Sequence, residues 1–437
     1  MNESEKTRRD FLQKTAVTAA AASAFPAGVH AQKNSKDELK VALIGCGGRG
    51  TGAAAQALAA GDKNKMWAMA DIDPKQLERS KETLIKNSKD GAVDVPTERQ
   101  FVGLEAYKQV MEMDEIDVVI LTTPPGFRSF HFEAAVQAGK HAFLEKPVAT
   151  DAPGVRRVLK SAAEAKAKNL KVGVGFNRRH STLHKNLIGR LHDGVIGEIP
   201  LIQVYNCRGP VNKRQTRQPG WSELEFQIRN WYYFTWLSGD FIVEQSVHEF
   251  DVVRWIKHEQ NPVSCIGQGG KIVMTGEMDG QTYDHFSADY RFADGSQVIT
   301  THRHIPKCWN FFGEKITGTK GTAELKAKSS GLINLTGQEA PVFREREASN
   351  SYQIEHDELF SAIRNDTEFN EGERGGYSTL FSMMGRMAAY TGKEITWEQA
   401  LNDDTEIARN PVSFDEETPI QPGPDGIYDV VAKPGVG

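Results

Sequence analysis

Residues 39–50 read Leu-Lys-Val-Ala-Leu-Ile-Gly-Cys-Gly-Gly-Arg-Gly, and this stretch decides the fold. The apolar run 39–44 is typical of a strand buried inside a parallel sheet. Gly45, Gly47 and Gly50 follow at the spacing G-x-G-x-x-G, and residues 51–60 continue with a helical pattern. Such a loop lets the backbone approach the pyrophosphate of a dinucleotide, an anion that the helix N-terminus attracts. The stretch therefore predicts a dinucleotide-binding βαβ unit.

An acidic residue after the next apolar run supports this interpretation. Residues 66–70 form that run, and Asp71 ends it. The carboxylate of Asp71 is expected to accept hydrogen bonds from the ribose hydroxyls and to repel a 2′-phosphate, so NAD is favoured over NADP. Gly48 and Arg49 complete the predicted cofactor loop. The alternative is a tight turn in an α/β protein that binds no nucleotide.

Strands and helices alternate over the first part of the chain, which predicts an α/β fold with an N-terminal Rossmann doubly wound parallel sheet. Residues 87–100 are expected to form a surface insertion. Further strands are expected at 116–123, 141–144 and 171–176, and helices at 75–86, 104–113, 129–138 and 151–169.

The pattern changes beyond about residue 180. Residues 199–205 and 287–299 alternate polar and apolar side chains, and the second stretch predicts a hairpin that turns at Ala293-Asp294-Gly295. We therefore expect a C-terminal α+β domain with a large, mostly antiparallel open sheet, and an exposed sheet face would favour a homo-oligomer. The predicted parts are a Rossmann domain at 39–167, a substrate-binding and dimerisation domain at 168–400, and a surface tail at 401–437.

The N-terminus has the pattern of an export signal. Residues 7–14 read Thr-Arg-Arg-Asp-Phe-Leu-Gln-Lys, which resembles a twin-arginine signal. Residues 16–29 are too short and too mildly apolar for a membrane span, and Val29-His30-Ala31 suits cleavage after Ala31. We therefore predict a signal peptide at 1–31, a periplasmic or otherwise exported protein, and no membrane insertion. An ordinary Ala-rich helix with two chance arginines is the alternative.

Composition and cysteine spacing disfavour several other classes. The formal net charge of -5 shows no basic excess of the kind that binds a phosphate backbone, so nucleic acid is not an expected partner. The four cysteines form no C-x-x-C pair, and Cys46 is interpreted as a small filler within the glycine loop. His302 and His304 share one face of an expected strand, but the sequence offers no third ligand, and no metal site is predicted.

Two further segments indicate a family. The first contains Thr122-Thr123-Pro124-Pro125, His131, Ala138-Gly139-Lys140-His141 and Glu145-Lys146-Pro147. The second runs from Glu244 through His248 to Asp251 and Trp255. With the glycine loop, they resemble the glucose–fructose oxidoreductase/inositol dehydrogenase (Gfo/Idh/MocA) family over roughly residues 39–395. The resemblance implies an NAD(P)-dependent oxidoreductase for a sugar or polyol, with Thr123, Pro124, His131, Glu145 and Lys146 around the cofactor.

Lys146 is the lysine of the Glu-Lys-Pro motif, which in this family lies near the nicotinamide and the reacting hydroxyl. A lysine at the carboxyl end of a parallel strand also faces the crevice where a dinucleotide binds. Its ammonium is expected to hydrogen-bond a hydroxyl and hold it for hydride loss. The alternative is a surface lysine, as most lysines are.

The second segment departs from the family's usual Asp-x-Gly-x-His-x-x-Asp. Glu244 replaces the usual aspartate and Ser246 replaces the glycine, which marks a subfamily with an altered site. The spacing of Glu244, His248 and Asp251 predicts one shared helix face. His248 is the candidate general base, because imidazole titrates near neutral pH; the alternative is a core histidine. Asp251 either orients His248 or has a packing role.

Candidate substrate contacts follow strands or precede the His248 segment. Arg178 or Arg179 is expected to hold a polar sugar group or to form a salt bridge. An aromatic cluster including Trp231 and Tyr232 either stacks on a sugar ring or forms plain core.

These observations predict an exported oxidoreductase for a sugar, polyol or glycoside that holds its NAD tightly, since the destination compartment has no obvious pool of free cofactor. It would pass hydride from one sugar to another, or hydrolyse a glycoside by transient oxidation, elimination, water addition and re-reduction. A non-catalytic sugar or nucleotide binder and an ordinary dehydrogenase that is not exported are the competing hypotheses.

Overall fold

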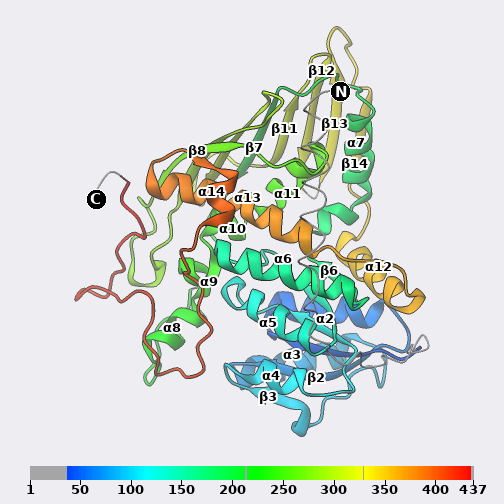
Figure 1. Ribbon diagram of the computed structural model, residues 1–437, viewed down its shortest axis with the longest axis vertical. Coiled ribbons are helices and arrows are strands. Elements are labelled where there is room, and N and C mark those ends of the chain that lie inside the picture. Colours follow the sequence, from blue (N-terminus) through cyan, green and yellow to red (C-terminus); the bar gives the residue numbers. More distant parts are fainter. Residues whose placement is uncertain (1–36, 212–213, 328, 435–437) are drawn as a thin grey trace, which may run out of the picture. The chain divides into compact units, whose positions relative to one another are not determined.

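Two β-sheets organise the described part of the chain. The computed structural model describes residues 37–211, 214–327 and 329–434. The predicted signal peptide at 1–31 lies outside these residues. Figure 1 shows the smaller sheet with strands β2, β3 and β6, and the larger sheet with strands β7, β8 and β11 to β14.

The smaller sheet is the predicted Rossmann sheet. Its order is β3-β2-β1-β4-β5-β6, and all neighbouring strands are parallel. The order reverses between β1 and β4, which places a crevice at the carboxyl ends of these strands. The strands are β1 (Lys40–Ile44), β2 (Lys65–Asp71), β3 (Gln100–Val102), β4 (Val118–Leu121), β5 (His141–Leu144) and β6 (Val172–Val174).

Helices cover both faces of this sheet, because its central strands bury side chains on each side. Val41 and Leu43 pack on the face covered by α2, α3 and α12, whereas Ala42 and Ile44 pack on the face covered by α4, α5 and α6. The helices are α2 (Gly48–Ala59), α3 (Pro74–Asn87), α4 (Ala106–Met111), α5 (Pro125–Gln137), α6 (Ala152–Ala167) and α12 (Ser351–Asn365).

Two details of this region differ from the sequence prediction. The end of the expected insertion contains a short helix, η1 (Thr97–Arg99), and leads directly into the edge strand β3. Helix α5 begins at Pro125 and not at residue 129, since proline is well suited to the first turn of a helix.

The larger sheet has nine strands in the order β14-β13-β12-β11-β7-β10-β9-β8-β15. Only β7 and β10 pair in parallel among these strands, so the predicted mostly antiparallel sheet is confirmed. The predicted hairpin is also present as β9 and β10. The strands are β7 (Leu201–Cys207), β8 (Ser264–Gly270), β9 (His285–Arg291), β10 (Gln297–Arg303), β11 (Phe311–Thr317), β12 (Gly321–Lys326), β13 (Ser330–Leu335), β14 (Phe343–Arg346) and β15 (Ile395–Thr396).

One face of this sheet packs on helices, and the other is open. Phe381 of α13 packs against Phe250 of α11 and Tyr290 of β9. On the opposite face Ile266 and Ile299 are exposed. The prediction of a homo-oligomer depends on this exposed face. The remaining helices are α7 (Thr182–His192), α8 (Glu223–Arg229), α9 (Thr235–Ser238), α10 (Phe241–Glu244), α11 (Val247–Ile256), α13 (Gly372–Thr391), α14 (Trp397–Asn402), η2 (Asn177–His180), η3 (Trp231–Tyr233) and η4 (Glu277–Asp279).

The C-terminal tail follows the surface, as predicted, but it is also anchored. Tyr428 is buried against Phe226 and Phe234. The hydroxyl of Tyr283 donates to the carbonyl of Ala432 at 2.9 Å. These contacts fix the tail beside α8.

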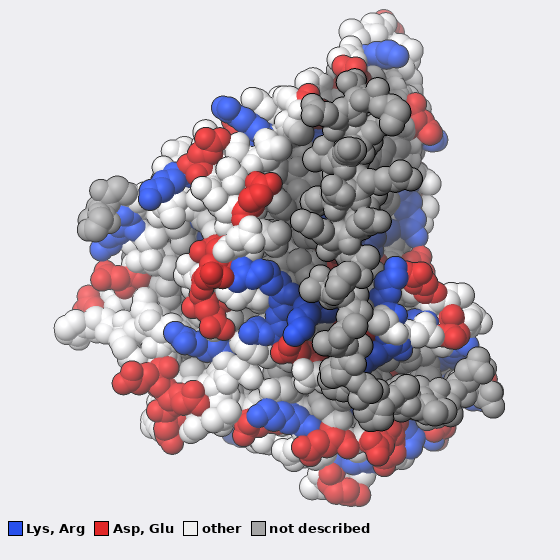
Figure 2. All heavy atoms as spheres, in the orientation of Figure 1, with Lys and Arg blue, Asp and Glu red and all other residues white. Residues whose placement is uncertain are grey.

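No described helix combines the length and the apolar character that crossing a membrane requires. Figure 2 shows basic and acidic side chains interspersed on one face of the molecule.

Candidate active site

The glycine loop joins β1 to α2 by close backbone contacts. The Gly45 amide donates to the carbonyl of Ala70 at 2.8 Å, and Gly45 has a φ of 97°, a conformation that favours glycine. A Cβ on Gly50 would collide with the carbonyl oxygen of Gly45, whereas a Cβ on Gly47 would meet no atom within 4 Å. Gly50 is therefore needed to pack the loop on its helix, and Gly47 leaves open space above it.

That open space belongs to a cavity at the carboxyl ends of β1, β2 and β4. Its lining includes many of the predicted cofactor residues: Gly45, Gly47, Asp71, Thr123, Pro124 and His131. Residues separated by up to 86 positions in the sequence thus surround one space. The same cavity is lined by Gln76, Tyr107 and Phe127, which the sequence analysis did not single out.

Asp71 lies at the end of β2 with its carboxylate held by the backbone. The Cys46 amide donates to Oδ2 at 2.6 Å, and the Asp73 amide donates to Oδ1 at 2.9 Å. Burial raises the pKa of Asp71, although these two hydrogen bonds oppose the change. Burial also raises the pKa of the Cys46 thiol well above its ordinary value, which agrees with its interpretation as a filler.

The outer wall of the cavity comes from distant parts of the chain. Gln215, Arg229, Trp231, Asn410 and Pro411 contribute to it. Trp231 therefore lies in the wall of the predicted cofactor cavity, and its contact with a substrate stays a prediction. No local motif marks the other four, because they reach the cavity only through tertiary packing.

Arg229 connects this wall to the Rossmann sheet. Its guanidinium forms ion pairs with Asp73 at 2.7 Å and with Glu225 at 2.9 Å, and it stacks on Trp221 at 4.6 Å. Asp73 follows Asp71 by two residues and caps α3. The Arg229–Asp73 pair therefore lies beside the predicted ribose site.

The segment after β4 places an imidazole, His131, in the cavity wall and a guanidinium, Arg128, behind it. His131 Nδ1 lies 3.1 Å from the Thr123 hydroxyl. Burial, together with the charge of Arg128, lowers the pKa of His131 to about 3, so this imidazole is neutral at pH 7. Arg128 donates to the carbonyl oxygens of Thr123 and Pro147, which ties the β4 loop to the Glu-Lys-Pro segment.

Arg49 and Glu145, two predicted cofactor residues, contact each other. Arg49 forms ion pairs with Glu145 and, at 3.1 Å, with Glu355 of α12. Neither lines the cavity described above, and their contact with a cofactor stays a prediction. Gly48 stands free of this network at the first position of α2.

Lys146 connects the end of β5 in the parallel sheet to the end of α10. It lies two residues beyond β5, and its Nζ donates to the Glu244 carbonyl at 2.6 Å and lies 3.1 Å from Glu244 Oε1. Gln245 donates to the other carboxylate oxygen of Glu244. Lys146 is therefore not a surface lysine, and its ammonium is held at the crevice.

The prediction of one helix face for Glu244, His248 and Asp251 is wrong. Glu244 ends α10, and α11 begins at Val247, so the chain changes helix between them. His248 is half-buried in the first turn of α11, edge-on to Phe176, with ring centroids 6.0 Å apart. Phe176 follows β6 as Lys146 follows β5, so both candidate catalytic residues come to the carboxyl ends of adjacent strands.

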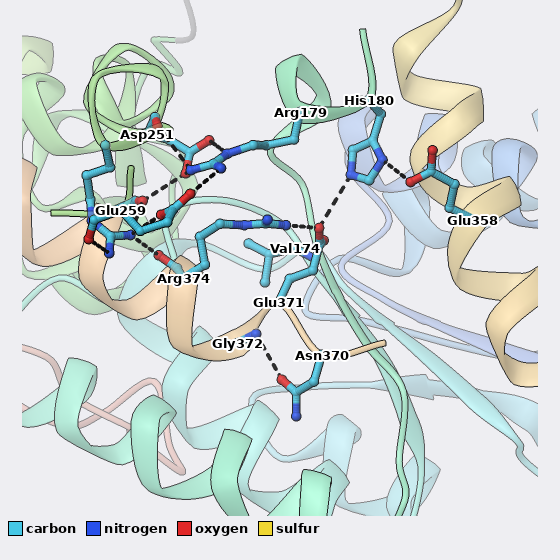
Figure 3. A network of polar contacts seen from close by, with 12 residues as sticks. Val174, Arg179, His180, Asp251, Glu259, Glu358, Asn370, Glu371, Gly372 and Arg374 are labelled. Carbon is cyan, nitrogen blue, oxygen red and sulfur yellow. Dashed lines mark hydrogen bonds and ion pairs between the residues drawn. The ribbon is translucent and has the colours of Figure 1, made fainter. Parts of the chain in front are cut away.

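Asp251 forms a buried ion pair with Arg179. Arg179 Nε lies 2.8 Å from Asp251 Oδ2, and Arg179 also pairs with Glu259 (Figure 3). Ser378 donates to Asp251 at 2.8 Å. This is the packing alternative for Asp251 and the salt-bridge alternative for Arg179.

Neighbouring buried ion pairs have the same structural character. Arg178 pairs with Glu249 and with Glu314 at 3.0 Å, again the salt-bridge alternative. His180 lies between Glu358 and Glu371 (Figure 3). Burial alone would lower the pKa of His180, but its contacts with these carboxylates outweigh burial and raise it to about 9.

The remaining candidates lie deep beside Glu244. Tyr232 is buried and stacks on His304 with ring centroids 6.4 Å apart. His302 Nδ1 lies 2.8 Å from the Ser246 hydroxyl. Burial lowers the pKa of His302 and of His304 to about 3, and the described residues contain no cluster of three metal-ligating side chains.

Comparison with known proteins identifies the class and the family. Residues 39–176 match the oxidoreductase family with an NAD-binding Rossmann fold, and residues 188–390 match the C-terminal alpha/beta domain of that family. The chain is therefore built as an NAD-binding oxidoreductase. It belongs to the Gfo/Idh/MocA family, as its motifs indicated.

Individual relatives are more distant. The chain is 29% identical over 188 residues to an inositol 2-dehydrogenase of Rhizobium meliloti, covering 43% of this chain and 50% of that protein. It is 28% identical over 164 residues to a glycosyl hydrolase family 109 protein of Shewanella pealeana, covering 37% and 34%. The matched stretches span about half or less of these two curated relatives.

A solved structure shows the same fold over a greater length. Aldose-aldose oxidoreductase from Caulobacter crescentus, complexed with glycerol, superposes with a TM-score of 0.65 at 17% identity. The match covers 82% of this chain and 99% of that chain.

The two glycines make a testable contrast. Gly47→Ala places a methyl group toward the cavity without touching protein atoms, and we expect NAD affinity to fall about tenfold or more, since the loss of one good contact has this size. The melting temperature without NAD should stay near that of the wild type. Gly50→Ala should instead destabilise the protein by about 1–3 kcal/mol through overpacking. Calorimetric titration with NAD and thermal melts measure both effects.

Gly189→Ala is the matched control, because Gly189 is an exposed helical glycine whose added Cβ meets nothing within 4 Å. Unchanged NAD affinity in Gly47→Ala would show that the cofactor does not approach this loop.

Proposed function

We propose that this protein is an NAD-dependent oxidoreductase that oxidises or reduces a hydroxyl-bearing carbon of a sugar or polyol. The Lys146–Glu244 contact carries the proposal, because it holds an ammonium and a carboxylate together where β5 ends. The cavity beside the glycine loop opens at the ends of neighbouring strands of the same sheet. The sugar and inositol activities named for its relatives support the same substrate class.

The chain's own residues would manage the proton. NAD supplies a hydride acceptor when it is bound. The Lys146 ammonium has three N–H donors. Two are directed to Glu244, and the third is available to orient a substrate hydroxyl. His248 takes the hydroxyl proton as hydride leaves, because neutral imidazole is a suitable base near pH 7. In reduction the same groups return the proton.

We further propose that NAD rather than NADP is bound, and that it is released slowly. The carboxylates of Asp71 and Asp73 beside the ribose site disfavour a 2′-phosphate. The outer wall of the cavity includes Arg229, Trp231 and Asn410, which come from segments outside the Rossmann sheet and would slow the exit of a bound dinucleotide. Asn410 donates to the Tyr107 hydroxyl at 3.2 Å, which connects the tail to this wall.

Export completes this proposal. The twin-arginine pattern at residues 7–14 is typical of proteins that fold with their cofactor before they cross the membrane. An exported enzyme with captive NAD must restore the cofactor in place. Transfer of hydride from one sugar to a second sugar satisfies this requirement.

A second candidate, redox-assisted glycoside hydrolysis, is favoured by the match to a glycosyl hydrolase family 109 protein. Oxidation, elimination of the aglycone, water addition and re-reduction would also return NAD to its starting state. The two modes differ in product. Hydrolysis releases an aglycone with no net redox change, whereas transfer yields one oxidised and one reduced sugar.

Lys146→Ala tests the catalytic assignment. We expect turnover of a panel of D-glucose, D-galactose, D-xylose and myo-inositol to fall at least about 100-fold, the size of a typical acid–base contribution. NAD binding should persist, because Lys146 does not line the cofactor cavity. Turnover is followed by NADH absorbance, and bound NAD by mass spectrometry after denaturation.

Lys160→Ala on the exposed face of α6 is the control. Wild-type activity in Lys146→Ala, or no reduction of NAD by the wild type with any of the four compounds, would contradict the assignment.

Arg229→Ala tests retention of the cofactor. Loss of the ion pair with Asp73 should speed NAD release about three- to tenfold, as a partly exposed pair contributes about 1 kcal/mol. The measurement is the NAD content of the protein during dialysis. The control is Arg217→Ala, which removes a more exposed pair with Glu223 on the same helix. Equal rates of NAD release from the wild type and from Arg229→Ala would show that the Arg229–Asp73 pair does not retain the cofactor.

Replacement of both arginines, Arg8→Lys with Arg9→Lys, tests export. We expect the precursor to accumulate in the cytoplasm, because the pathway reads the paired arginines. Immunoblots of cell fractions measure the distribution, and Lys14→Arg is the control. A wild-type protein found only in the cytoplasm would overturn the export proposal while leaving the oxidoreductase unaffected.

A further inference from the structure

A polar cluster on the larger sheet lies beside the candidate catalytic pair and plays no part in the chemistry above. Arg208 follows β7 and His304 follows β10, and the Arg208 amide donates to the carbonyl of Arg303 at 3.0 Å. Tyr232 of η3 stacks on His304. We call Arg208, Tyr232 and His304 the sheet-edge cluster, after the edge of the sheet at which β7 and β10 end; both strands are central in the strand order.

This cluster adjoins Glu244, the partner of Lys146. Burial raises the pKa of the Tyr232 phenol well above its ordinary value, the Glu244 charge adds to this rise, and the Arg208 charge opposes it. Tyr232 is therefore within electrostatic reach of both charged groups. His304 also stacks on Phe241 of α10 with ring centroids 4.1 Å apart, and Glu244 ends the same helix, so the sheet-edge cluster packs beside the helix that carries the partner of Lys146.

Arg208 differs from the neighbouring arginine in its partners. Arg178 has two buried carboxylates, Glu249 and Glu314. Arg208 forms no ion pair within the part of the chain that the structure describes, and its guanidinium stacks on Phe312 at 5.0 Å. Glu249 is close enough to interact with the Arg208 charge, but it is already ion-paired with Arg178.

Tyr232 and His304, the other two members of the cluster, carry no negative charge that could neutralise the guanidinium of Arg208. Burial, followed by the charge of Arg208, lowers the pKa of His304 to about 3, so its ring is neutral at pH 7. Among the described residues, the Tyr232 hydroxyl and His304 Nε2 are buried without a hydrogen-bond partner. Such groups are costly to leave unsatisfied, and a bound ligand would satisfy them.

We propose that the sheet-edge cluster binds the carboxylate of a sugar acid, such as a uronic acid, while Lys146 addresses a hydroxyl of the same molecule. This inference rests on the proposed function and adds its substrate class. An arginine fork fits a carboxylate in two hydrogen bonds. Tyr232 and His304 then serve as neutral hydrogen-bonding groups for the rest of the sugar. The single guanidinium of Arg208 matches a monoanion better than the dianion of a phosphate ester.

The experiment compares sugar acids with their neutral counterparts on the NAD-loaded full chain. D-Glucuronate is paired with D-glucose, and D-galacturonate with D-galactose; D-glucose 6-phosphate is added as the phosphate arm. The readouts are the shift in melting temperature at each ligand concentration and kcat/KM from NADH absorbance.

We expect at least one acid to bind about 10- to 100-fold more tightly than its neutral counterpart, the size of a charge-assisted hydrogen-bonded contact. Arg208→Gln should remove this preference and leave the affinity for the neutral sugar nearly unchanged. Arg208→Lys, which keeps the charge, should retain part of it. The control Arg190→Gln removes an exposed arginine that stacks on Phe343 at 4.8 Å.

Two results would overturn the inference: no acid binds better than its neutral counterpart, or the preference survives in folded Arg208→Gln. A preference for the sugar phosphate alone would overturn the carboxylate assignment. The melting shift separates this proposal from the catalytic one. A melting shift that depends on Arg208 but comes without turnover supports the anion site and contradicts the oxidoreductase activity. Turnover of neutral sugars with no preference for the acids supports the oxidoreductase activity and contradicts the anion site.

Discussion

The contact between Lys146 and Glu244 is the interaction on which the site depends. It joins the carboxyl end of β5 in the parallel sheet to the end of α10, which leads into the helices packed on the larger sheet. Both side chains are largely buried, so removing either partner would leave an uncompensated charge in a poorly solvated place. The same pair therefore fixes the two halves of the crevice and positions the ammonium for chemistry.

The sequence predicted correctly those strands, loops and turns whose structure is determined by a short stretch of chain. The apolar run 39–44 and the glycine spacing sufficed for the Rossmann sheet, because a buried parallel strand and a tight loop leave direct marks in the sequence. Residues 287–299 marked a hairpin for the same reason. Among the cofactor residues, those that end strands, such as Asp71 and Thr123, reached the predicted cavity because parallel strands end at one edge.

Long-range electrostatic pairing decides what local sequence patterns left open. Arg178 and Arg179 follow β6 near the crevice, but their partners Glu249, Glu314 and Asp251 come from 71 to 136 residues away. Periodicity also missed the change of helix between Glu244 and Val247, since an i, i+4 spacing is equally compatible with one helix or two. Arg229 carries no motif at all, and only the fold brings it to Asp73.

The two departures from the family's usual motif become intelligible together. Glutamate at 244 carries one more methylene than aspartate, and its carboxylate reaches Lys146 while its own carbonyl also accepts from that ammonium. Serine at 246, where the family usually has glycine, adds a hydroxyl that lies 2.8 Å from His302 and accepts from Asn206 at 3.2 Å. These contacts connect the junction of α10 and α11 to β7 and β10. The substitutions thus change how the crevice is held against the larger sheet, on the side where Arg208 follows β7.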